Sequence, residues 1–269
     1  MNFLERALTA LSTTMERPQP YGWFHIMFVV IMVVVTIAVS LLLRKKSDKT
    51  IRVVVLTYAA ICLLFEVYKQ LLFSYTPATN TWDYQWYAFP FQFCSTPMYV
   101  ALVAGLIKKG KVQQSLYSFL ATFGALAGIA VMIMPNDVFI SEIGINIQTM
   151  IHHGGQVFIG IFLLVTRRAK LDFKTPLRAL PTFVVLLITA LILNLTLINF
   201  VGNETFNMFF ISPHFNSTLP VFSTIQSQMP YVLFLLTYIF AMTAGAYLLT
   251  SLAIFVRFVG RKLKKEERI

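Results

Sequence analysis

Seven long apolar runs, each close to the length needed to cross a bilayer, constrain this chain more than any other feature of its sequence. Only 12% of the 269 residues are charged whereas 57% are hydrophobic, which is far from the composition of a water-soluble domain. The pattern predicts transmembrane helices over 21–43, 52–73, 89–107, 113–134, 146–166, 177–200 and 229–256. We therefore expect an all-α polytopic membrane protein whose transmembrane domain, residues 21–256, is a seven-helix bundle.

The basic residues predict how this bundle is oriented. Nineteen of the 22 Lys and Arg residues fall in four segments that lie at alternate ends of the predicted helices along the chain, and therefore all on one side of the membrane, namely 44–52, 108–111, 167–178 and 257–268. The remaining loops contain no Lys or Arg and cover 74–88, 135–145 and 201–228. Because cytoplasmic loops are enriched in Lys and Arg, we expect the N-terminus outside and the C-terminus in the cytoplasm.

The two ends of the chain are expected to lie at the membrane surface. Residues 1–20 are too short and too charged for a span, but Phe3, Leu8 and Leu11 share one helical face, which predicts a short interfacial helix. Residues 257–269 form a basic cytoplasmic tail. The tail and the net charge of +11 fit contact with anionic headgroups, and we expect no nucleic-acid partner.

Ionisable groups inside a membrane are costly and mark either function or a buried pair. At about 1.5 Å per residue, those of the predicted spans lie roughly 5 to 11 Å below the outer surface. The groups in this layer are His25, Glu66, Lys69, Cys94, His152 and His153. The layer predicts that any chemistry faces the external leaflet.

Several of these residues have a structural alternative. Glu66 and Lys69 share a helical face, so they form either a self-neutralising ion pair or a group that orients a histidine. His25 suits an interfacial position. Cys62, near the predicted centre of the bilayer, suits the role of a small hydrophobic residue, and two cysteines within apolar runs do not make a disulfide framework.

A polar stripe runs along the predicted helix over 146–166. Gln148, His152 and Gln156 recur every four residues and are expected to face the interior of the bundle. Gln148 is placed to fix the tautomer of the His152 imidazole. His153 points about 100° away and is expected to be a neighbour or a packing residue.

Cys94 and His152 together suggest nucleophilic chemistry. A buried thiol is inert without a base within reach, and an imidazole at the same depth would provide one. Such a pair is the minimal unit for acyl transfer through a thioester. At this depth the available electrophile is the ester of a glycerolipid, whose acyl chain lies in the bilayer.

Three segments carry a resemblance to a known family. FPFQFCSTP surrounds Cys94, IHHG occupies 151–154, and FNMFFISP occupies 206–213. In these motifs and in their order along the chain, the sequence resembles the YwaF-like bacterial membrane proteins, relatives of an animal transmembrane ether-phospholipid acyltransferase. The family's Pro-x-x-x-Cys is matched by Pro90 and Cys94.

The resemblance implies that Cys94 is the nucleophile and His152 its base, and that an acyl chain passes between phospholipid and lysophospholipid. It also implies a multi-pass protein of the bacterial cell membrane. Asn207 and Met208 resemble the family's Asn-Tyr-Met segment without its central aromatic residue, and Asn207 is a candidate donor to an oxyanion.

Other functions are compatible with the same residues. The lipid-ester hydrolase alternative differs only in that water resolves the thioester. A transporter or a sensor of a small molecule is a non-enzymatic alternative, although its pathway should continue into the cytoplasmic half, where polar residues are few. A metal or haem site is a further alternative, but adjacent histidines diverge too far to chelate one ion. We expect no metal and no cofactor.

Overall fold

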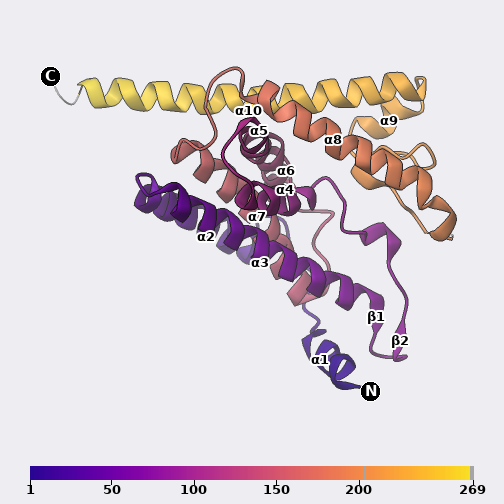
Figure 1. The fold of residues 1–269 in the computed structure, drawn as a ribbon. Helices are drawn as coiled ribbons and strands as arrows, with labels where there is room; N and C mark the ends of the chain where they lie inside the picture. The colour runs from indigo at the N-terminus through magenta and orange to yellow at the C-terminus, as the bar shows by residue number, and fades with distance from the viewer. Residues whose placement is uncertain (203, 267–269) are drawn as a thin grey trace.

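The computed structural model describes residues 1–202 and 204–266, and it is almost entirely helical (Figure 1). Its helices are α1 (Phe3–Leu11), α2 (Trp23–Leu43), α3 (Asp48–Ser74), η1 (Trp86–Ala88), α4 (Thr96–Leu106), α5 (Lys111–Phe119), η2 (Leu120–Gly124), α6 (Ala125–Ile133), α7 (Ile143–Val165), α8 (Thr175–Thr196), η3 (Ile198–Phe200), η4 (Met208–Phe210), α9 (Phe222–Gln226) and α10 (Tyr231–Glu266). Two short antiparallel strands, β1 (Tyr75–Thr76) and β2 (Thr81–Trp82), form a hairpin after α3.

Six helices are long and apolar enough to cross a membrane. They are α2, α3, the continuous helix Lys111–Ile133 formed by α5, η2 and α6, α7, α8, and α10 up to Leu263. These helices confirm an all-helical, multi-pass membrane protein. The count of seven spans and the orientation of the termini stay predictions.

The predicted helix over 89–107 is wrong in its first half. Regular helix begins only at Thr96, and Phe89–Ser95 is a series of turns. Pro90 and Pro97 explain the difference, because proline cannot donate to a preceding turn and is favoured in the first turn of a helix. The 11 residues of α4 extend about 16 Å, roughly half the hydrocarbon thickness of a bilayer.

The predicted boundary at residue 256, between the transmembrane domain and the basic tail, stays a prediction. The described part of the basic tail does not leave the last span but continues it as the final turns of α10, to Glu266. Residues 267–269 lie outside the described part of the chain. In Figure 1 this end of α10 and the turn between α2 and α3 lie on the left, whereas α9 and the β1–β2 hairpin lie on the right.

Helix α7 is the centre of the bundle. It packs against α2, α3, α6 and η2, and it buries residues on every side (Figure 1). In contrast, α2 is the most apolar span and leaves most of its surface exposed, as expected for a helix that faces lipid. The polar stripe of α7 is therefore enclosed by the neighbouring helices.

Short α1 covers one end of this arrangement. Its N-terminus has a reciprocal cap, in which the Asn2 side chain accepts from the Glu5 amide and the Glu5 side chain accepts from the Asn2 amide. Leu8 is buried against Leu72 and Ile145, at the ends of α3 and α7 that the charge distribution predicts to be external.

Close packing between α6 and α7 depends on Gly128, the second glycine of a Gly-x-x-x-Gly pair. A Cβ atom at Gly128 would lie 2.6 Å from the carbonyl oxygen of His153 and 2.8 Å from Cβ of Gln156. At the first glycine, Gly124, an added Cβ atom would lie 3.4 Å from Cγ of Pro97 in α4. The pair of glycines therefore allows the continuous helix Lys111–Ile133 to lie close to both α4 and α7.

We expect Gly128→Ala to lower the melting temperature of the protein in detergent, because overpacking costs about 1–3 kcal/mol and forces α7 away from α6. Gly260→Ala is the matched control, because it lies in α10 and a Cβ there meets nothing within 4 Å. Alanine should leave stability at position 260 equal or slightly higher. Equal melting temperatures for both variants and the wild type would contradict this account of the packing.

Candidate functional site

Cys94 lies in the irregular segment Phe89–Ser95, directly before the N-terminus of α4, and is partly buried. Local hydrogen bonds fix this segment. The amides of Ser95 and Thr96 donate to the Gln92 carbonyl at 2.9 and 3.2 Å, and the Tyr99 hydroxyl donates to the Pro90 carbonyl at 2.9 Å. Cys94 thus directly precedes the N-terminus of α4, which is the positive end of its helix dipole.

The backbone carbonyl of Cys94 joins this segment to α7. His152 Nε2 lies 3.0 Å from the Cys94 oxygen, and Gln156 Nε2 donates to the same oxygen at 2.6 Å. Both side chains are almost fully buried and lie one turn apart on α7. The structure therefore brings Cys94 and His152 together through the carbonyl oxygen of Cys94.

This contact defines the tautomer of His152. A carbonyl oxygen only accepts, so Nε2 carries the proton and Nδ1 carries the lone pair. Gln148, the expected partner of the imidazole, instead accepts from the Thr149 hydroxyl at 3.4 Å. Within the described residues, His152 Nδ1 and Gln156 Oε1 are buried and have no hydrogen-bond partner. The site thus retains a basic nitrogen and an acceptor oxygen that the protein does not use.

His153 faces a different neighbour. Its Nδ1 donates to the Thr149 carbonyl at 2.8 Å, one turn back along α7, and its carbonyl oxygen lies against Gly128 of α6. Among the described atoms, its Nε2 has no partner. His153 is accordingly a packing residue on the α6 side.

Glu66 and Lys69 form an ion pair on α3, with 2.8 Å between Glu66 Oε1 and Lys69 Nζ. Gln70 Nε2 donates to the same carboxylate oxygen at 2.8 Å and to the Ala88 carbonyl at 2.7 Å. Ala88 directly precedes the irregular segment, so Gln70 ties the ion pair to the chain that carries Cys94. Of the two roles expected for Glu66 and Lys69, the ion pair is the one that the structure contains.

His25 lies elsewhere, buried at the start of α2. Its Nδ1 accepts from the Tyr21 amide at 3.0 Å, and its Nε2 donates to the Met132 carbonyl at 2.9 Å. The ring also contacts Phe139, with 5.8 Å between ring centroids. His25 therefore braces the ends of α2 and α6 and does not meet Cys94.

The side chain of Asn207 is used within the segment between α8 and α10. Its Nδ2 donates to the Asn216 carbonyl at 3.1 Å and to the Phe215 carbonyl at 3.4 Å, and its Oδ1 accepts from the Ser212 amide at 2.8 Å. As folded, this amide braces a loop and has no donor left for an oxyanion.

Asn194 and Phe209 are parts of the site that sequence reasoning did not identify. Asn194 of α8 exchanges two hydrogen bonds with the Met208 backbone, at 3.0 and 2.8 Å. The next residue, Phe209, has a left-handed backbone (φ 59°) and is fully buried against Phe93 and Phe91, at centroid distances of 5.2 and 6.0 Å. This segment therefore covers the chain that carries Cys94. An asparagine inside an apolar span is the signal that points to such a contact.

In the described residues, no group of three or more His, Cys, Asp or Glu side chains is close enough together to hold a metal ion. The functional groups of the cluster are instead a partly buried thiol, an imidazole, two amides and an ion pair. The fold and this cluster together define a helical multi-pass membrane protein with a polar site inside the bundle.

Comparison by sequence identifies the family. Residues 20–250 match the TMEM164 family, so the chain belongs to this family of transmembrane proteins. Comparisons with curated proteins and with solved structures gave no match.

The two donors to the Cys94 carbonyl lead to a prediction about stability. Gln156→Met and His152→Leu should each cost about 1 kcal/mol, because the other donor still satisfies the carbonyl. The double variant leaves a buried carbonyl unpaired, so its loss should exceed the sum of the two single losses by about 1–3 kcal/mol. Reversible unfolding in detergent measures all three values.

Gln148→Met is the matched control for this cycle, because Gln148 lies on the same stripe and its recorded hydrogen bond is to Thr149 and to neither donor. Its combination with His152→Leu should give additive losses. Additive losses for Gln156→Met with His152→Leu would contradict a shared carbonyl.

Proposed function

We propose that the protein is a membrane-embedded acyltransferase that moves an acyl chain between phospholipid and lysophospholipid through a thioester on Cys94. The observation that carries the proposal is the contact between His152 and the Cys94 carbonyl, which joins a buried imidazole to the backbone of a partly exposed cysteine and leaves its Nδ1 without a proton or a hydrogen-bond partner among the described residues. The resemblance of the Cys94, His152 and Asn207 segments to the ether-phospholipid acyltransferase supports the same activity.

In the first half-reaction, His152 Nδ1 accepts the thiol proton and the Cys94 sulfur attacks the ester carbonyl carbon of a phospholipid. The ester C–O bond breaks, and the proton passes to the departing oxygen to give a lysophospholipid. In the second half-reaction, Nδ1 accepts the proton of an acceptor hydroxyl, whose oxygen attacks the thioester. The C–S bond breaks and the sulfur regains the proton.

The surroundings of Cys94 suit these steps in two ways. The N-terminus of α4 favours negative charge at the sulfur and at the oxygen of the tetrahedral intermediate. The unpartnered oxygen of Gln156 is available to accept from the hydroxyl of an incoming lysophospholipid. With the predicted orientation, the site opens to the external leaflet of a bacterial cell membrane.

His152→Gln tests the chemistry apart from the fold. A glutamine amide placed at Nε2 can still donate to the Cys94 carbonyl, but it is not a base. We expect near-native melting and a fall in acyl transfer of roughly 10²–10⁴-fold, the usual contribution of a general base. Mass spectrometry of the protein in phospholipid should find an acyl thioester on Cys94 of the wild type.

His214→Gln is the control, because His214 is exposed and its side chain has no described contact with the site. It should keep the wild-type rate. Unchanged remodelling of lipid acyl chains by Cys94→Ala would overturn the proposal. If water replaces the lysophospholipid as acceptor, fatty acid will accumulate at the same rate with and without added lysophospholipid, and the protein is then a lipid-ester hydrolase.

A further inference from the structure

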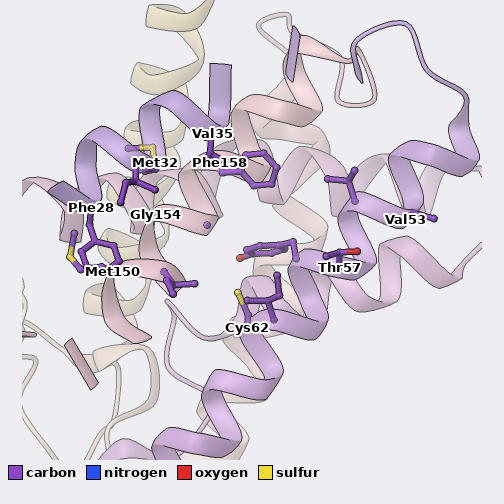
Figure 2. Close-up of a pocket in the computed structure, with 15 residues that line it drawn as sticks. Phe28, Met32, Val35, Val53, Thr57, Cys62, Met150, Gly154 and Phe158 are labelled. Atoms are coloured by element: carbon purple, nitrogen blue, oxygen red, sulfur yellow. The ribbon is translucent and has the colours of Figure 1, made fainter. Parts of the chain in front are cut away.

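An apolar groove of about 460 Å³ lies among α2, α3 and α7 (Figure 2). Both α2 and α3 pack on α7, and the groove lies where their side chains face each other across it. Phe28 and Met150 lie at one end of the groove in Figure 2, and Val53 lies at the other. The proposed reaction does not use this groove.

The residues that line the groove favour a hydrocarbon ligand. Of its fifteen residues, only Thr57, Tyr58 and Cys62 bring a hydroxyl or a thiol, and none is charged. A polar ligand would lose its hydration there without gaining hydrogen bonds, at a cost of several kcal/mol. The floor is kept open by Gly154 and Gly155 of α7, where a Cβ atom would lie 3.3 Å from Met32 and 3.0 Å from the Tyr58 ring.

The groove is elongated along α3. From Val53 to Cys62 the groove follows α3 for nine residues, or about 13 Å. A narrow, flexible chain fits the same space.

One end of the groove leads to the polar layer. Along α3, Tyr58, Cys62, Glu66 and Lys69 recur every three or four residues and lie on one face, so the ion pair begins one turn beyond the groove. On α7, Gly154 and Phe158 line the groove, while the intervening Gln156 reaches the Cys94 carbonyl. Hydrocarbon and polar surfaces therefore meet along the same two helices.

We propose that this groove binds one acyl chain of a membrane phospholipid, with the ester end at the Glu66–Lys69 layer and the methyl end toward Val53. Attack of Cys94 on this ester rests on the proposed function, whereas binding of the chain in the groove does not. The chain enters sideways from the bilayer, because the mouth of the groove is formed by exposed apolar residues of α2 and α3 such as Ile31, Val35 and Ile61.

The test is photolabelling of the purified full-length protein in phosphatidylcholine vesicles that contain a phosphatidylcholine with a diazirine on one acyl chain. Peptide mapping should find the label concentrated on residues that line the groove. Ile61→Trp fills the groove from α3 and should lower this labelling about tenfold, as expected for overpacking by 1–3 kcal/mol. Leu64→Trp is the control, because Leu64 is exposed on the same helix outside the groove.

A second pair of variants tests the groove from α2, in case Ile61→Trp does not fold. Val35→Trp fills the groove from α2, while Val34→Trp places the same side chain on an exposed position outside it. Labelling spread evenly over the lipid-facing helices, or equal labelling in the filled and control variants, would overturn the proposal. Crosslinks between two copies of the protein in the groove would overturn it as well.

Cys94→Ala separates this proposal from the proposed function, since binding of the chain does not need the thiol. We expect groove labelling in Cys94→Ala to equal that of the wild type. A Cys94 thioester without groove labelling refutes the groove and leaves the acyltransferase standing. Groove labelling in a wild-type protein that forms no thioester supports the groove and refutes the acyltransferase.

Discussion

The two hydrogen bonds from α7 to the carbonyl of Cys94 are the interaction on which the rest of the site depends. Inside a bilayer, backbone that leaves regular helix must find partners within the protein. In the segment Phe89–Ser95, which leaves regular helix within the protein, His152 and Gln156 provide donors that a continuous helix would have provided itself. The same contact places a cysteine beside an imidazole and fixes which ring nitrogen is basic. His152 therefore holds the irregular segment with Nε2 and leaves Nδ1 without a partner among the described residues.

The irregular segment is also held from its other side. Asn194 and Asn207 use their side-chain amides on backbone between α8 and α10, and this allows Phe209 to adopt a left-handed conformation that a bulky residue rarely takes. The strain is maintained because the Phe209 ring is fully buried against Phe93. Two polar networks, one on α7 and one that joins α8 to the segment between α8 and α10, thus hold the chain around Cys94.

Much of this architecture could be predicted from the sequence, and the exceptions have physical causes. Apolar run length identified six spans to within a few residues at most ends, because the bilayer sets helix length. Pro90 and Pro97 are the signal for the break in the segment over 89–107, which hydropathy alone cannot detect. The stripe of Gln148, His152 and Gln156 predicted which face of α7 is polar. The stripe did not predict that His152 and Gln156 would bind the backbone carbonyl of Cys94. Periodicity along one helix carries no information about the segment that packs against it.

Helix α7 presents different kinds of side chain on its different faces. Glycines at 128 of α6 and at 154 and 155 of α7 allow close approach and leave the groove open, while His152 and Gln156 extend from the same turns toward α4. A lipid lying in the groove would thus have its hydrocarbon beside one face of α7 and its ester near another. Both faces belong to one helix, in which each residue advances about 1.5 Å along the axis. The distance along α7 between the apolar surface and the polar surface is therefore fixed. A phospholipid imposes the same requirement, since its acyl chain and ester are joined covalently.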